Sequence, residues 1–142
     1  MKRSTKVTSV ILIFFLIIAI VIIGRTMIGN HFKKKFKVID ARSKERFEGK
    51  VPEPRKGLRS GNIKNSLCLP FNECLNDNKT FKNKEELQNI FKSCIENIYE
   101  KNIVFSCGSG VTACVLALAY SLINDKYQPS IYDGSWAEYG II

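Results

Sequence analysis

Apolar and polar positions along the chain divide it into one long apolar stretch and a following series of short periodic segments. The apolar run at residues 7–23 contains no charged side chain, whereas a helix packed in a protein core shows a polar face. After residue 36, short apolar runs of strand length alternate with helical patterns. This alternation is typical of an α/β domain with a mainly parallel sheet flanked by helices.

The limits of the expected strands and helices follow from the periodicity and the turn residues. Strands are expected at residues 36–40, 66–70, 102–107 and 130–132, and helical segments at 43–49, 71–75, 84–98, 113–123 and 136–140. The helix after Asn83 has the clearest pattern, because Asn83 and Glu86 form a capping-box pair and apolar residues then recur at helical spacing. Residues 50–66 contain two prolines and two glycines and are expected to be irregular.

Residues 7–28 are predicted to form a transmembrane signal-anchor helix. A spanning helix needs about 20 apolar residues, with a lower limit of about 17, and Met27 and Ile28 extend the run past Arg25. A cleaved signal peptide stays an alternative, although the residues after the run offer no convincing small-residue cleavage site.

The formal net charge of +9 is concentrated on both sides of this run. Much of it lies in the basic N-terminal flank, residues 1–6, and in the basic linker, residues 29–35. The other lysines are scattered without interleaved aromatic side chains, so nucleic acid is not an expected partner. Because the heavier basic cluster follows the run, we expect a single-pass membrane protein whose domain at 36–142 is cytosolic.

The five cysteines do not form a disulfide or metal pattern. They are Cys68, Cys74, Cys94, Cys107 and Cys114. An odd number without a Cys-x-x-Cys pair disfavours both a disulfide framework and a zinc site, and fits reduced thiols. Cys94 is expected in the core, and Cys114 is expected to pack within a helix.

The segment FSCGSGVTACV, residues 105–115, is the strongest candidate for chemistry. A buried strand is expected to end at Cys107, where a tight loop leads into a helix. The residues that follow Cys107 in this loop are Gly108, Ser109, Gly110, Val111 and Thr112. Glycines permit the positive φ angles with which several N–H groups converge on one point, and the helix N-terminus adds its positive dipole end.

A thiol in such a loop is expected to be acidic. The hydroxyls of Ser109 and Thr112 can also donate hydrogen bonds to a sulfur anion, so we expect a thiolate or a persulfide at Cys107. A plain strand-to-helix turn with a buried cysteine is the alternative. A cysteine phosphatase is disfavoured because Ala113 stands where its arginine is needed, and the loop lacks the lysine of a nucleotide-binding P-loop.

The loop CGSGVTAC resembles the active-site loop of the mercaptopyruvate sulfurtransferases of the rhodanese family. The segments VIDARSKERFEG, PEPRKGLRSGNI and YDGSWAEYG agree in the same order, so the resemblance covers about residues 37–140. It is a resemblance to the second, catalytic domain of proteins that usually carry two rhodanese domains. The chain departs from the family pattern at residues 61–65, where GNIKN replaces Gly-His-Ile-Pro-Gly, and at Tyr139, where tryptophan is usual.

The resemblance implies a single rhodanese-like domain that is a sulfurtransferase enzyme without cofactor or metal. Cys107 would take sulfur from a small-molecule donor, 3-mercaptopyruvate or thiosulfate, as a persulfide. It would then pass the sulfur to a thiol acceptor such as thioredoxin, or to cyanide. Arg46 and Arg55 match the family's arginines that hold the substrate's carboxylate, whereas Arg42 and Arg59 are interpreted as structural.

Three further hypotheses remain open. Because the family's active site lies between two domains, a second rhodanese domain acting in trans is implied as a further partner. The chain is alternatively a non-catalytic or partner-dependent, membrane-tethered rhodanese-like module that binds a partner or carries sulfur. It is alternatively a fragment or a misjoined gene product.

Overall fold

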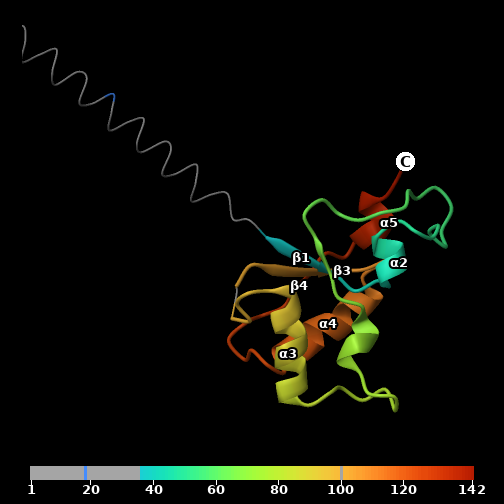
Figure 1. The fold of residues 1–142 in the computed structure, drawn as a ribbon. Coiled ribbons are helices and arrows are strands. Elements are labelled where there is room, and N and C mark those ends of the chain that lie inside the picture. Colours follow the sequence, from blue (N-terminus) through green and yellow to red (C-terminus); the bar gives the residue numbers. More distant parts are fainter. Residues whose placement is uncertain (1–17, 19–35, 100) are drawn as a thin grey trace, which may run out of the picture. The chain divides into compact units, whose positions relative to one another are not determined.

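A parallel sheet forms the centre of the domain in this computed structural model, which describes residue 18 and residues 36–99 and 101–142 (Figure 1). Its four strands are β1 (Lys37–Asp40), β2 (Leu67–Cys68), β3 (Ile103–Ser106) and β4 (Ser130–Ile131), in the order β2-β1-β3-β4. All neighbouring strands are parallel, and Asp40 at the end of β1 is paired with Ser106 at the end of β3. The carboxyl ends of the two central strands therefore meet at one edge of the sheet.

Helices flank this sheet, which confirms the predicted α/β fold. They are α2 (Lys44–Phe47), the 3-10 helix η1 (Phe71–Cys74), α3 (Lys84–Cys94), α4 (Val111–Ser121) and α5 (Ser135–Tyr139). Helices α3 and α4 lie on one side of the sheet, and α2 and α5 lie on the other (Figure 1). Helix α4 begins at Val111 rather than at residue 113, because Gly110 has a left-handed φ of 83° and already serves as its N-cap.

The capping box predicted for α3 is present. The Asn83 side-chain oxygen accepts a hydrogen bond from the Glu86 N–H at 2.9 Å, and the Glu86 carboxylate accepts one from the Asn83 N–H at 3.1 Å. An N-cap of this kind stabilises a helix by about 1 kcal/mol. It fixes the start of α3, whose Leu87 and Phe91 are fully buried.

An aromatic cluster joins α3, β3 and α4 in the core. The ring of Tyr120 lies with its centroid 5.1 Å from that of Phe91 and 5.7 Å from that of Phe105, and all three side chains are buried. Aromatic pairs in this arrangement contribute about 0.5–1.5 kcal/mol beyond the burial of their area. The cluster fixes β3 against α4, and so fixes the loop that joins them.

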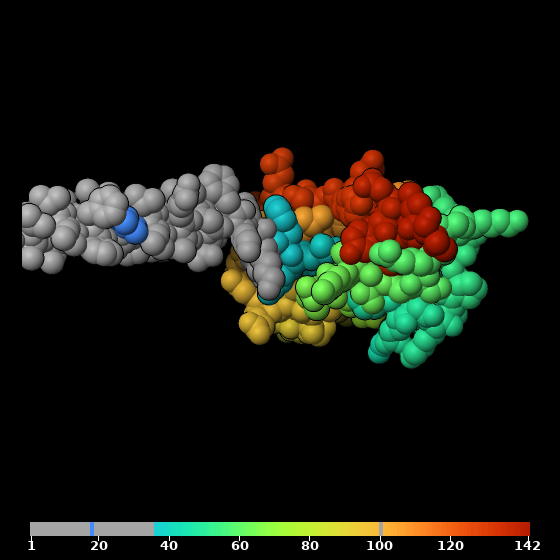
Figure 2. Space-filling view, turned by 90° about the horizontal axis from the view of Figure 1, so that it is seen from above, coloured from blue at the N-terminus to red at the C-terminus, as the bar shows by residue number. Residues whose placement is uncertain are grey.

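Residues 50–66 contain no helix or strand, as the sequence predicts. The middle of this segment is tied to the C-terminus: Leu58 forms an antiparallel bridge with Ile141, and the Arg59 N–H donates to the Gly140 carbonyl at 2.9 Å. Figure 2 shows the two segments side by side, in green and red. At residues 61–65, where the chain departs from the family pattern, the Gly61 carbonyl accepts a hydrogen bond from Arg42 at 2.8 Å.

The predicted membrane helix, residues 7–28, falls outside the described residues apart from Ile18. In the part of the chain that the structure does describe, no helix is long and apolar enough to cross a bilayer. The longer helices there, α3 and α4, have 11 residues each, whereas a span needs about 20. The predicted single-pass membrane location with a cytosolic domain is accordingly corrected: the described part of the chain shows no membrane-spanning helix.

Candidate functional site

Cys107 lies directly after β3, at the carboxyl edge of the sheet. In α/β sheets, ligand sites gather at this edge. The Cys107 side chain is buried, and the chain turns through Gly110 before α4 begins. A Cβ atom at Gly110 would lie 3.2 Å from the Asp133 carbonyl oxygen, so both the positive φ and the close approach require glycine here.

The loop and the first turn of α4 surround the Cys107 sulfur with hydrogen-bond donors. The Ser109 N–H donates to this sulfur, with the nitrogen 3.4 Å away. Burial by itself raises the pKa of the thiol. Hydrogen bonds from the Thr112 hydroxyl and from the N–H groups of Ser109, Ala113 and Thr112 outweigh it, so the pKa of Cys107 lies below its usual value. Cys107 therefore ionises to the nucleophilic thiolate more readily than an ordinary cysteine does.

Three other thiols have pKa values shifted the opposite way. Burial raises the pKa of Cys68 to about 11 and that of Cys74 to about 12, and it also raises the pKa of Cys94. Cys94 packs against the core, as predicted. Within the described residues, no group of three or more histidine, cysteine or acidic side chains is arranged to hold a metal ion.

The prediction that Cys114 packs inside the helix is wrong. Cys114 is exposed on the first turn of α4, and its thiol donates a hydrogen bond to the Gly110 carbonyl at 3.4 Å. Cys114 does lie within α4, but on the exposed face of this helix.

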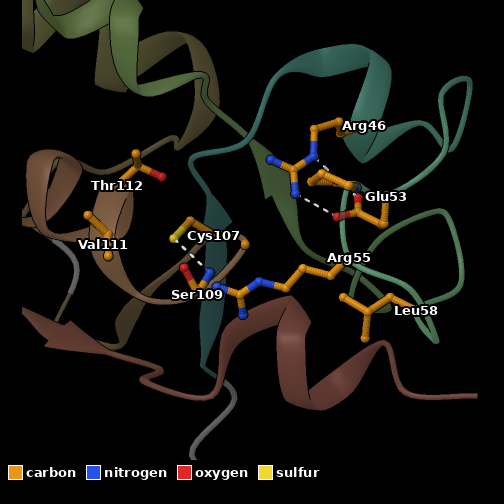
Figure 3. Close-up of a pocket in the computed structure, with 10 residues that line it drawn as sticks. Arg46, Glu53, Arg55, Leu58, Cys107, Ser109, Val111 and Thr112 are labelled. Atoms are coloured by element: carbon orange, nitrogen blue, oxygen red, sulfur yellow. Dashed lines mark hydrogen bonds and ion pairs between the residues drawn. The ribbon is translucent and has the colours of Figure 1, made fainter.

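Cys107 faces a cavity of about 220 Å³ (Figure 3). Its lining residues are Arg46, Glu53, Pro54, Arg55, Leu58, Cys107, Gly108, Ser109, Val111 and Thr112. Every predicted site residue except the buried Gly110 is among them. Residues from α2, from the irregular segment and from the cysteine loop are thus brought together around one small space.

The two predicted arginines reach the cavity from different elements. Arg46 belongs to α2, and its guanidinium lies so close to Gly108 that a Cβ atom there would be 3.1 Å from the Arg46 Nη2. Arg55 is exposed, and Figure 3 shows its side chain pointing from the irregular segment toward Ser109. Both arginines therefore line the cavity that Cys107 faces.

Glu53 is a site residue that the sequence reasoning did not identify. Its side chain is 1% exposed, and its carboxylate pairs with the Arg46 Nη2 at 2.5 Å and with the Arg42 Nη1 at 2.7 Å. The pairing fixes Arg46 at the wall of the cavity. Residues 42–59 hold three acidic residues, Glu45, Glu48 and Glu53, among four arginines, so the sequence alone does not single out Glu53.

Arg42 and Arg59 make the contacts expected of structural residues. Arg42 is buried and pairs with Asp40 at 2.8 Å. The Arg42 and Arg59 guanidinium carbons lie 4.5 and 5.2 Å from the centroid of the Trp136 ring, in a cation–π arrangement. Neither side chain lines the cavity that Cys107 faces.

A parallel α/β domain that presents a buried, acidified cysteine from a glycine-rich loop is the arrangement of a rhodanese-like domain. The rhodanese-like domain family matches residues 27–141. The chain belongs to the rhodanese family.

Curated relatives of the chain are sulfurtransferases. It is 49% identical over 102 residues to the mitochondrial thiosulfate/3-mercaptopyruvate sulfurtransferase 1 of Arabidopsis thaliana, covering 71% of this chain and 26% of the relative. It is 42% identical over 113 residues to the mouse 3-mercaptopyruvate sulfurtransferase, covering 80% of this chain and 37% of the relative. The chain thus spans only about a quarter to two-fifths of the length of these relatives.

Two solved structures are similar to this chain in fold and sequence. A yeast protein, Tum1 of Saccharomyces cerevisiae, superposes with a TM-score of 0.65 at 33% identity, covering 78% of this chain and 38% of that chain. The 3-mercaptopyruvate sulfurtransferase SseA of Escherichia coli superposes with a TM-score of 0.59 at 34% identity, covering 80% of this chain and 40% of that chain.

Proposed function

We propose that this chain is a sulfurtransferase domain that carries sulfane sulfur from 3-mercaptopyruvate, through a persulfide on Cys107, to a thiol acceptor. The observation that carries the proposal is the environment of the Cys107 sulfur, where N–H donors lower the thiol pKa beside a cavity flanked by Arg46 and Arg55. The naming of the chain's relatives as thiosulfate or 3-mercaptopyruvate sulfurtransferases supports the choice of donor.

The donor's carboxylate is proposed to bind between Arg46 and Arg55. A guanidinium binds a planar carboxylate through two parallel N–H···O bonds, which orients the donor as well as holding it. Glu53 occupies one side of the Arg46 guanidinium. The donor therefore uses the remaining N–H groups of Arg46, together with the exposed Arg55.

In the first step, the Cys107 thiolate attacks the sulfur of 3-mercaptopyruvate. A sulfur–sulfur bond forms as the donor's carbon–sulfur bond breaks, and the electron pair of the broken bond stays on carbon. The resulting enolate of pyruvate takes up a proton, and the sulfur remains on Cys107 as a persulfide. The N–H groups that stabilise the thiolate are also suitable for the persulfide anion.

In the second step, an acceptor thiolate attacks the outer sulfur of the persulfide. The acceptor becomes a persulfide, and Cys107 leaves as the thiolate that began the cycle. Thioredoxin and cyanide are the proposed acceptors to compare, and thiosulfate is the alternative donor. A second rhodanese-like domain acting in trans is a proposed partner, because the chain spans only part of its relatives.

The test is to incubate the full chain with 3-mercaptopyruvate and to map the adduct by mass spectrometry while pyruvate is measured. We expect one added sulfur on the peptide that contains Cys107. The adduct should be absent in Cys107→Ser and unchanged in the matched control Cys114→Ser, which removes an exposed thiol of the same loop-and-helix segment.

No adduct on the wild-type chain, or an equal adduct in Cys107→Ser, would refute the proposal. Binding of the donor without release of pyruvate would instead support a non-catalytic rhodanese-like module. Recovery of pyruvate release on addition of a second rhodanese-like domain would identify a partner-dependent enzyme.

A further inference from the structure

Ser135, the first residue of α5, has an unusual backbone conformation for its residue type. Its φ is 47°, in the left-handed region, and its side chain is fully buried. A residue with a Cβ atom adopts this region only at an energetic cost, and such residues persist where the surroundings determine their conformation. The contacts of Ser135 therefore indicate what holds it there.

The Ser135 hydroxyl connects the two ends of the cysteine loop. Its oxygen accepts hydrogen bonds from the N–H of Cys107 and from the N–H of Gly110, each at 3.1 Å, and it donates to the Tyr132 carbonyl at 2.7 Å. A serine hydroxyl has one donor and two acceptor positions. Ser135 thus uses its full hydrogen-bonding capacity, and two of its three bonds go to the loop.

The backbone of α5 binds the same loop. The Trp136 N–H donates to the Cys107 carbonyl and the Ala137 N–H to the Gly108 carbonyl, both at 2.9 Å. Because the first turn of α5 holds these groups, the loop has little freedom to change its curvature. The N–H of Ser109 is left pointing at the sulfur.

We infer that Ser135 is a positioning residue for Cys107, whose hydroxyl holds the loop in the curvature that aims its N–H groups at the sulfur. Ser135 does not line the cavity, so it acts through the loop and not on a substrate. The inference deepens the proposed function, on which its relevance to sulfur transfer rests.

Other charged groups also face this site and must stay constant in a test. Arg46 from α2 and Glu53 and Arg55 from the irregular segment line the cavity, and Asp133 lies against Gly110 from the turn before α5. A neutral substitution of Ser135 alters none of these charges. A change in the acidity of Cys107 can therefore be assigned to the loop.

The experiment measures the rate of alkylation of Cys107 by iodoacetamide as a function of pH, with the adduct mapped by mass spectrometry. The thiolate displaces iodide and forms a carbon–sulfur bond, so the rate follows ionisation of the thiol. In the full chain carrying Ser135→Ala we expect the profile to move to higher pH. At neutral pH we expect alkylation about tenfold slower, which corresponds to the loss of roughly one hydrogen bond's contribution to the anion.

Ser106→Ala is the matched control. Ser106 is also a buried serine, it directly precedes Cys107, and its hydroxyl has no hydrogen-bond partner among the described residues. Its profile should match the wild type. Ser135→Gly serves as a second variant, because it removes the hydroxyl and at the same time relieves the cost of the positive φ.

A wild-type profile in Ser135→Ala or in Ser135→Gly overturns the inference, and so does an equal shift in Ser106→Ala. If both Ser135 variants fail to fold, the residue is structural and the inference is likewise wrong. The readout does not depend on sulfur transfer. A wild-type chain that forms no persulfide would refute the proposed function while leaving this result intact.

Discussion

Replacing Glu53 by glutamine tests whether the buried Glu53 carboxylate holds Arg46 at the wall of the cavity. Glu53→Gln keeps the shape of the side chain but removes its charge, and it turns an NH₂ group toward one of the arginines. Removing one partner of a buried ion pair costs about 3–5 kcal/mol. Arg42 keeps its pairing with Asp40, and the Arg46 side chain is 28% exposed, so we expect a smaller loss, about 2–3 kcal/mol.

Urea unfolding of the full chain, followed by circular dichroism, measures this loss in the free energy of unfolding. Glu48→Gln is the control, because the Glu48–Lys50 pair at 2.6 Å lies at the surface, with side chains 33% and 70% exposed. Exposed pairs contribute about 0–1 kcal/mol. A loss in Glu53→Gln that is no larger than in Glu48→Gln would refute the assigned role.

Three further predictions concern acidity, backbone and substrate. At pH 8 iodoacetamide should label Cys107 well before Cys68, because the pKa of Cys107 is lowered and that of Cys68 is raised to about 11. The free energy of unfolding that the Cys107 thiolate contributes should be lost as the pH falls through the lowered pKa of Cys107. Gly110→Ala should lose about 1–3 kcal/mol of unfolding free energy and more than Gly57→Ala, since both positions have a positive φ but a Cβ atom meets a neighbour within 4 Å only at Gly110. Arg55→Lys should raise the KM for 3-mercaptopyruvate about tenfold with a smaller change in kcat, because lysine lacks the bidentate fork; an unchanged KM in steady-state kinetics would count against carboxylate binding there.

The sequence was sufficient to predict features that depend only on residues close together in the chain. The Asn83 capping box and the apolar face of α3 are set within one helix. The Cys107 loop was recognisable because glycines after an apolar strand mark a tight turn into a helix. These features need no knowledge of distant residues.

Contacts between distant residues were not recognisable in the same way. Ser135 reaches Cys107 across 28 residues, and Glu53 joins arginines from two other places in the chain. Such contacts between distant side chains leave no periodic pattern in the sequence. The exposure of Cys114 was missed because it depends on which side of α4 faces the sheet, and the largely apolar sequence of this helix has no polar face that marks the outer side.

The chain's one tryptophan, Trp136, is hydrogen-bonded through its backbone N–H to the Cys107 carbonyl. Trp136 is buried, its indole N–H donates to the Arg59 carbonyl at 2.9 Å, and two guanidinium groups lie over its ring. Indole emission is sensitive to nearby charge and to movement of the backbone. Trp136 is therefore an intrinsic fluorescence probe. Rearrangements of the cysteine loop can be followed in real time by its emission, without any added label.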